Sequence, residues 1–264
     1  MPARLAVVGG GRMGEALLSG LLAAGWASAQ DLVVVEKLAD QRQRLAARHP
    51  TLTVTDKPPP SEAAVIAVKP TDVQEACGVV AASGASRVLS IAAGVPLRRL
   101  EEWLPGGTPV VRAMPNTPAL VGAGAAAVAA GSWAGEEDLA WAESILSAVG
   151  VVVRLPESLL DAVTGLSGSG PAYLLLVAEA LVDAGVLVGL PRDVSKVLAF
   201  HTMLGAARML HETGETPEAL RAAVTSPGGT TEAGLRVLEA EGVRAALLEA
   251  VAAATERSRQ LGQG

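Results

Sequence analysis

Three glycines at fixed spacing are the first residues of this sequence whose types could support chemistry. Gly9, Gly11 and Gly14 follow the apolar run at 5–8 and precede a helical pattern of Ala and Leu. Between a strand and a helix, the first glycine permits a tight turn, the second admits a pyrophosphate, and the third lets helix and strand approach. The helix start then offers free N–H groups to the phosphates. The spacing predicts a dinucleotide site, and an ordinary glycine loop is the alternative.

Glu36 is the next candidate, because it closes the second apolar run, at 32–35. A carboxylate at this place can accept both ribose hydroxyls of the adenosine half and would repel a 2′-phosphate. That favours NADH over NADPH. The alternative is a solvated residue beside Lys37, which could itself attract a phosphate. We therefore expect NADPH or NADH as the cofactor, with the preference open.

Two further loops follow apolar runs. Lys69 and Pro70 come after the run at 63–68, at the sheet edge where ligands of doubly wound folds collect, so we expect them near the nicotinamide ribose. Asn116 lies between two prolines that stiffen its loop, and its amide could bind a ligand. The alternatives are a solvated lysine at a strand end and a merely rigid turn.

The segment 225–231 opens a helical pattern and carries glycines and hydroxyls. The N–H groups from Gly229 to Thr231 are expected to point at one place near the helix start, which makes a carboxylate site without a cation. The hydroxyls of Ser226 and Thr231 add donors. The alternative is simple capping of the helix by Thr230 or Thr231.

Other reactive residue types form no cluster. The three histidines are scattered, with no carboxylate or Cys at metal-ligand spacing, so no metal site is expected. No Ser occupies a nucleophile-elbow motif, which argues against a hydrolase. The single Cys77 cannot form an intrachain disulfide and is interpreted as a reduced interior thiol.

The elements that must position these residues alternate along the first part of the chain. Helical patterns separate the strand-like runs, and this alternation predicts a parallel sheet wrapped by helices, an α/β fold of the Rossmann doubly wound type over residues 1–155. The expected strands are 4–8, 32–35, 52–55, 63–68, 87–92, 109–112 and 151–155.

Beyond Pro156 only helical patterns follow, so we expect a second, all-α domain over 156–264. One helix there is apolar around most of its circumference, since 174–182 contains Glu179 as its only charged residue. Such a helix must be surrounded by protein. A tail of about 110 residues could hardly bury it alone, which predicts a homodimer through the helical domain.

Composition excludes several classes of partner. A net charge of −6 without any block of Lys or Arg argues against nucleic acid. The apolar run at 5–8 is too short for a signal-peptide core. The charge-free stretch 113–135 is broken by prolines and glycines, so we expect no membrane segment and a cytoplasmic location.

Taken together, the motifs resemble the pyrroline-5-carboxylate reductase family over nearly the whole chain. The resemblance implies a Rossmann domain plus a helical dimerisation domain, with substrate near the dimer interface and dimers often assembling into rings. It also implies reduction of 1-pyrroline-5-carboxylate to L-proline by hydride transfer from NAD(P)H, the last step of proline biosynthesis. Besides the glycine loop, the matching motifs are AVKP at 67–70, IAAGVP at 91–96, RAMPNTPALVGAG at 112–124, DAVTGLSGSGPAY at 161–173 and VTSPGGTTEAGL at 224–235.

Carried onto matching positions, the resemblance implies a cofactor site and a substrate site. We hypothesise that the hydroxyl of Thr231 is catalytic and hydrogen-bonds the imine nitrogen. The cofactor residues are Gly9, Gly11, Arg12, Met13, Gly14, Glu36, Ala67, Val68, Lys69, Pro70 and Asn116, and the substrate residues are Ser226, Gly229, Thr230 and Thr231.

Two departures from the family pattern stand out. His201 occupies a position where many relatives have Gln. Glu36 occupies a position where many relatives have Ser, Asn or Arg. A related hydroxy-acid dehydrogenase is the closest rival, but it would need a Lys on the helix after the domain boundary, and Lys196 lies well downstream. A non-catalytic dinucleotide sensor is a second rival; it would have little reason to keep the loop at 224–235.

Overall fold

The computed structural model describes residues 2–263 and separates into two compact units. The sheet unit comprises Met1–Ser169 and Ala252–Gly264, and the helical unit comprises Gly170–Val251. The domain boundary predicted from the sequence lies between residues 155 and 156. In the structure the first unit extends to Ser169, and the chain enters it again at Ala252. Packing explains the difference, because Leu160 is fully buried in the core of the sheet unit and Ser258 donates a hydrogen bond to Asp161 (2.7 Å).

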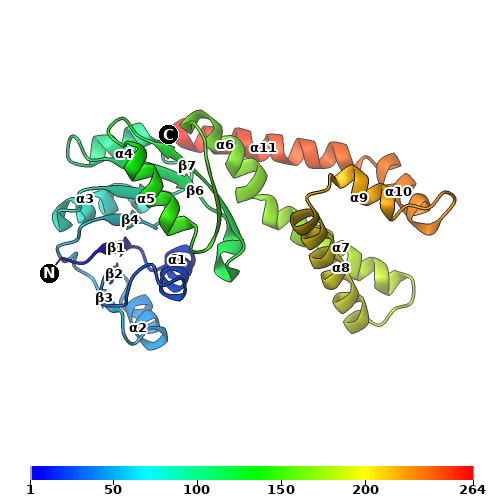
Figure 1. Ribbon diagram of the computed structural model, residues 1–264, viewed down its shortest axis with the longest axis horizontal. Coiled ribbons are helices and arrows are strands. Elements are labelled where there is room, and N and C mark those ends of the chain that lie inside the picture. Colours follow the sequence, from blue (N-terminus) through cyan, green and yellow to red (C-terminus); the bar gives the residue numbers. More distant parts are fainter. Residues whose placement is uncertain (1, 264) are drawn as a thin grey trace. The chain divides into compact units, whose positions relative to one another are not determined.

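One eight-stranded sheet forms the centre of the sheet unit (Figure 1). Its order is β3-β2-β1-β4-β5-β6-β7-β8, which begins with the doubly wound order of Rossmann folds and confirms that prediction. All pairs are parallel except β6 with β7. The strands are β1 (Leu5–Val8), β2 (Leu32–Val35), β3 (Thr53–Thr55), β4 (Ala64–Ile66), β5 (Val88–Ser90), β6 (Val110–Met114), β7 (Gly124–Ala130) and β8 (Gly150–Arg154).

Helices cover both faces of this sheet. Alternate residues of a strand point to opposite faces, so Val7 joins the core beneath one set of helices and Ala6 the core beneath the other. Burial on both faces explains why β1 and β2 are continuous apolar runs. One face carries α1 (Arg12–Ala23), α2 (Ala39–Arg48) and α5 (Glu136–Leu146); the other carries α3 (Val73–Ser83), α4 (Leu97–Trp103) and α6 (Leu160–Val163).

The strand β7 and the helix α5 are absent from the sequence prediction. The segment of β7 reads GAAAVAA, and alanine and glycine have low strand propensity, so the pattern carries no strand signal. Its antiparallel pairing with β6 makes the sheet mixed, although every other pair is parallel as predicted. The pairing follows from a short connection, the helical turn η2 (Thr117–Val121), which leaves no room for a crossover helix.

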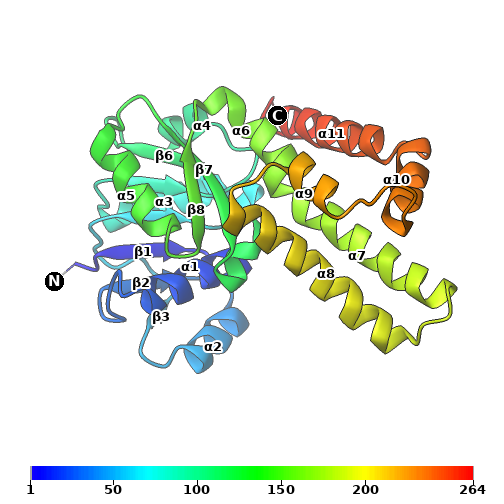
Figure 2. The same cartoon turned by 45° about the vertical axis from the view of Figure 1, so that its right-hand side comes forward.

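The helical unit contains only helices among its described residues, as predicted. Its helices α7 (Gly170–Leu187) and α8 (Arg192–Thr213) lie side by side along much of their length (Figure 2). The helices α9 (Pro217–Ala223) and α10 (Thr230–Ala240) follow. The last helix, α11 (Val243–Gln263), begins in the helical unit and ends in the sheet unit.

The helix α7 keeps most of its apolar side chains exposed in the single chain. Leu175 is 64% exposed and Leu176 66%, while only Ala178 and Val182 are buried. The helix predicted to be surrounded by protein is therefore not covered by its own chain. By length and composition alone, one stretch of the described residues, Glu157–Leu187, could also cross a membrane, with a mean hydropathy of 1.6.

Candidate active site

The glycine loop is packed tightly at its first and third glycines and open at its second. Gly9 has a φ of +104°, and a Cβ there would lie 2.6 Å from the carbonyl oxygen of Ala67. A Cβ on Gly14 would meet the carbonyl oxygen of Gly9. A Cβ on Gly11 would meet nothing within 4 Å. Open space therefore lies beside Gly11, which is the fit that a dinucleotide pyrophosphate requires.

The start of α1 faces this space. Gly11 is the N-cap and has no side chain to satisfy the first N–H groups of the helix. Arg12 is exposed at the first helical position, and Met13 is half-buried against the core. The geometry offers an anion the N–H groups and partial positive charge of a helix start, with a guanidinium close by.

The end of β4 lies against the glycine loop. Ala67 donates its N–H to the carbonyl of Val8 (2.8 Å), and a Cβ on Gly9 would lie 2.8 Å from the side chain of Val68. Lys69 and Pro70 continue from there as exposed residues at the carboxyl edge of the sheet. The structure thus brings Ala67 and Val68 together with the loop and places Lys69 and Pro70 at the same edge.

Glu36 is turned toward its own backbone neighbours. Its Oε2 accepts the N–H of Gly10 and its Oε1 accepts the N–H of Leu38, both at 2.9 Å. The residue is 9% exposed. A carboxylate at the end of β2 was expected, but these two bonds to main-chain N–H groups could not be foreseen from spacing. The interpretation of Glu36 as a solvated residue was wrong.

Asn116 also binds backbone at both ends of its amide. Its Oδ1 accepts the N–H of Ala125 (2.9 Å) and its Nδ2 donates to the carbonyl of Ser167 (3.1 Å). The residue is 8% exposed. Ser167 belongs to a π-helical turn, Thr164–Gly168, and such turns are frequent at functional sites. Asn116 therefore ties the start of β7 to the glycine-rich segment before α7, a role that sequence reasoning missed.

The predicted substrate loop ends at the start of α10. Gly229 is the N-cap, and Thr230 and Thr231 are the first two helical residues, with both side chains exposed. Neither threonine hydroxyl caps the helix, so that alternative was wrong. Of the N–H groups from Gly229 to Thr231 that were expected to point at one place, that of Gly229 donates to the carbonyl of Ser226 (3.0 Å) in the turn that closes the loop.

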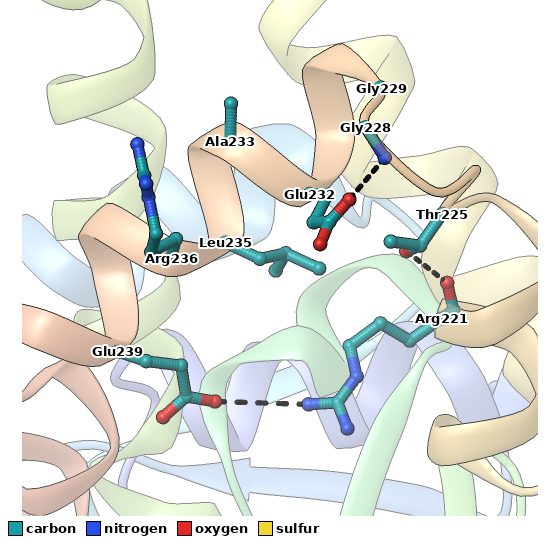
Figure 3. A pocket seen from close by; sticks show the side chains of 9 residues that line it. All are labelled: Arg221, Thr225, Gly228, Gly229, Glu232, Ala233, Leu235, Arg236 and Glu239. Atoms are coloured by element: carbon teal, nitrogen blue, oxygen red, sulfur yellow. Dashed lines mark hydrogen bonds and ion pairs between the residues drawn. The ribbon is translucent and has the colours of Figure 1, made fainter.

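A cavity of about 600 Å³ lies beside this loop, between α9 and α10 (Figure 3). Glu232 points back into the loop and accepts the N–H of Gly228, while Arg221 reaches toward Glu239, with 3.9 Å between the charged atoms. The two carboxylates at the wall thus have partners within the helical unit. The lining residues are Arg221, Thr225, Gly228, Gly229, Glu232, Ala233, Leu235, Arg236 and Glu239.

The candidate residues divide between the two units. All predicted cofactor residues lie in the sheet unit, and all predicted substrate residues lie in the helical unit. Across residues 2–263, no three His, Cys, Asp or Glu side chains gather closely enough to hold a metal ion. His201 is exposed on α8.

Comparison with known proteins gives matches along the whole chain. A family model described as pyrroline-5-carboxylate reductase dimerisation matches residues 157–261, and one described as NADP oxidoreductase, coenzyme F420-dependent, matches residues 4–94. A pyrroline-5-carboxylate reductase of Synechocystis is 46% identical, with 100% of both chains covered. The structure of a pyrroline-5-carboxylate reductase from Coxiella burnetii is similar with a TM-score of 0.90, at 34% identity and 99% coverage of both chains. A Plasmodium falciparum pyrroline carboxylate reductase with NADP bound has a TM-score of 0.86, at 29% identity and 98% coverage of both chains.

Proposed function

The chain belongs to the pyrroline-5-carboxylate reductase family, and from this membership we propose that the sheet unit holds the nicotinamide cofactor while α10 holds the substrate carboxylate. The protein is an NAD(P)-dependent oxidoreductase that reduces 1-pyrroline-5-carboxylate to L-proline, the last step of proline biosynthesis. The observation that carries this conclusion is the full-length identity of 46% to a named relative.

Gly11 and the first turn of α1 would hold the pyrophosphate of the cofactor, NADH or NADPH. The open space at Gly11 and the absence of a side-chain cap support this placement. When bound, the reduced nicotinamide supplies the hydride. The residues that we propose for the cofactor site are Gly9, Gly11, Arg12, Met13, Gly14, Glu36, Ala67, Val68, Lys69, Pro70 and Asn116.

The substrate carboxylate binds at the start of α10. The N–H groups of Thr230 and Thr231 have no intrahelical partners at these positions, and the hydroxyl of Ser226 adds a donor. Gly229 contributes through its lack of a side chain, since its N–H is already bonded to Ser226. This arrangement fixes one end of the substrate without a cation.

Thr231 acts on the imine nitrogen. The hydride adds to the carbon of the C=N bond, the π electrons pass to nitrogen, and the protonated nitrogen becomes the amine of proline. A hydroxyl that hydrogen-bonds this nitrogen orients the ring and can relay a proton. Orientation is the main requirement of such a step, and ideal alignment of two reactants is worth about 7–11 kcal/mol.

The protein forms homo-oligomers and binds a small-molecule substrate. We propose that the oligomer is a homodimer built through the helical unit, that dimers assemble further into a ring, and that the enzyme works in the cytoplasm without nucleic acid or membrane partners. The exposed apolar side chains of α7 support the dimer. They also account for the hydropathy of the stretch 157–187 without a membrane.

An absorbance assay tests the function. NADH or NADPH is followed with 1-pyrroline-5-carboxylate and then with a panel of keto acids. Oxidation of either cofactor with the imine, and with none of the keto acids, is the expected result. Turnover of a keto acid alone would favour a hydroxy-acid dehydrogenase. Cofactor binding without turnover of any imine would favour a dinucleotide sensor.

A further inference from the structure

We propose that Glu36 and Gln41 hold Gly10 by its N–H and by its carbonyl, and so fix the glycine loop in the shape that accepts either cofactor. The inference rests on the proposed cofactor site and adds one positioning residue to it. Gln41 is new in this role, and Glu36 acts through the loop instead of through the ribose. Together we call these two side chains the Gly10 clamp.

The Glu36 half of the clamp is a buried carboxylate with two main-chain partners. One oxygen accepts from Gly10 and the other from Leu38, each at 2.9 Å, and only 9% of the residue is exposed. Hydrogen bonds to an ionised group are stronger than neutral ones. The bond from Gly10 therefore joins the end of β2 to the glycine loop, and the bond from Leu38 holds the carboxylate in that orientation.

The Gln41 half comes from the first turn of α2. Its Nε2 donates to the carbonyl of Gly10, and the side chain is half-buried. Gly10 thus has its N–H and its carbonyl bonded to two side chains from different elements. A short loop between a strand and a helix gains its defined shape at this point from those side chains.

Further contacts of α2 support the clamp. Arg42 donates through Nη1 to the carbonyls of Glu36 (2.9 Å) and Lys37 (2.8 Å), which braces the connection that carries the carboxylate. Leu45 packs so closely that a Cβ on Gly10 would meet its side chain. The loop is therefore enclosed on the α2 side and open at Gly11.

The clamp determines which groups remain for the cofactor. Because Glu36 takes up the N–H of Gly10, an anion meets the N–H groups that follow, at the start of α1. Those groups face the pyrophosphate, which NADH and NADPH share. Loss of the clamp should therefore weaken both cofactors by the same factor. A carboxylate that selected between them at the ribose would instead change the ratio of the two affinities.

Direct cofactor titration tests the clamp. The variants are Gln41→Leu, which removes the donor at similar size without a change of charge, and Glu36→Gln, which places an NH₂ group against a main-chain N–H. Gln43→Leu is the matched control, because Gln43 is an exposed glutamine on the same helix. NADH and NADPH are titrated into each enzyme by fluorescence, and kcat, KM and the melting temperature are measured alongside.

We expect Gln41→Leu to raise the dissociation constants of NADH and NADPH equally, by about tenfold, because a buried carbonyl loses its partner. The value of kcat at saturation should stay within about twofold, and Gln43→Leu should match wild type. An unchanged dissociation constant in Gln41→Leu would overturn the clamp. So would a Glu36→Gln enzyme in which only the ratio of the two affinities moves.

The titration does not depend on imine reduction. A wild-type enzyme that bound cofactor but did not reduce 1-pyrroline-5-carboxylate would overturn the proposed function, and the clamp would still be judged by binding. If Glu36→Gln does not fold, Gln41→Leu decides by itself, since it alters a half-buried side chain on a helix.

Discussion

Thr231 is the residue on which handling of the imine nitrogen depends in the proposed mechanism. Its hydroxyl is exposed in the first turn of α10 and does not cap the helix, so it is free to meet substrate. We expect Thr231→Val, which keeps the shape but loses the hydroxyl, to lower kcat at least about tenfold. Thr231→Ser keeps a hydroxyl and should retain most activity. Equal kcat and KM in the valine variant and in wild type would remove Thr231 from the mechanism.

Cys77 allows a prediction that does not involve the active site. The thiol is fully buried in α3, and burial raises the pKa of Cys77 from 9.0 to about 11. At a given pH below 9 its thiolate fraction is about a hundredfold lower than that of an ordinary thiol. A thiol reagent should therefore modify the folded protein only very slowly at pH 8 and react readily after unfolding. Rapid labelling of the folded protein would contradict the burial.

The same shift in the pKa of Cys77 makes stability depend on pH. The buried neutral thiol contributes to the stability of the folded protein. Because the pKa of Cys77 is raised on folding, this contribution is fully present below the unfolded pKa of 9 and is lost as pH rises through 11. Between pH 8 and pH 10, ionisation of Cys77 in the unfolded chain should lower the free energy of unfolding by about 1 kcal/mol. Urea unfolding of wild type and of Cys77→Ala at both pH values checks this, since the variant should lose less stability than wild type over that interval.

Spacing alone predicted where the candidate side chains lie along the chain, but not which way they point. The three glycines could be assigned from sequence because each follows a steric requirement of a strand, a turn or a helix. The hydrogen-bond partners of Glu36, Asn116 and Gly229 are backbone groups, which any residue type can supply. No pattern of side chains in the sequence therefore predicts these hydrogen bonds. Their hydrogen bonds are known only once the chain is folded.

At the scale of elements, an ion pair with a buried guanidinium joins β6 to the turn Glu157–Leu159, and the same carboxylate bonds to the start of α4. Arg112 donates through Nη1 to Glu157 (2.8 Å), and the same carboxylate oxygen accepts the N–H of Leu97 at 2.6 Å. Only 8% of the Arg112 side chain is exposed. The carboxylate of Glu157 thus accepts an N–H from the first turn of α4 and also neutralises the buried guanidinium of Arg112.

We expect Glu157→Ala to lower the free energy of unfolding by about 3 kcal/mol, because it leaves a buried guanidinium without a partner. The exposed pair of Arg192 with Asp183 is a fitting control, and Arg192→Ala should change stability by less than about 1 kcal/mol. Chemical denaturation of the three proteins measures both effects. A similar small change in both variants would mean that the Arg112 pair contributes no more than a surface pair.

The elements that sequence reasoning found are those with strong patterns. The β-branched run of β2 was predicted with its observed bounds. The strand β7 was missed because five of its seven residues are alanine, which fits helix as well as strand. Pairing with β6 overrides that weak local preference.

For the whole molecule, the uncovered face of α7 is the feature that calls for a partner copy. We expect Leu175→Asp to weaken the proposed homodimer at least about tenfold, because a charge would then be buried at its interface. Trp133→Gln alters an equally exposed residue outside the region matched by the dimerisation family and should leave the dimer intact. Sedimentation at micromolar concentration measures both. A Leu175→Asp protein that stays dimeric would exclude this part of α7 from the interface.

The path of the chain through its two units has a practical consequence for dissecting the protein. The helical unit is an insertion, since the chain enters it at Gly170 and returns to the sheet unit at Ala252. A fragment ending at residue 169 would lack the C-terminal half of α11, which belongs to the sheet unit. That half includes Ser258, the hydrogen-bond donor to Asp161. One proteolytic nick between the units therefore releases neither of them, and replacing the insertion by a short linker is the cleaner route to an isolated nucleotide-binding fold.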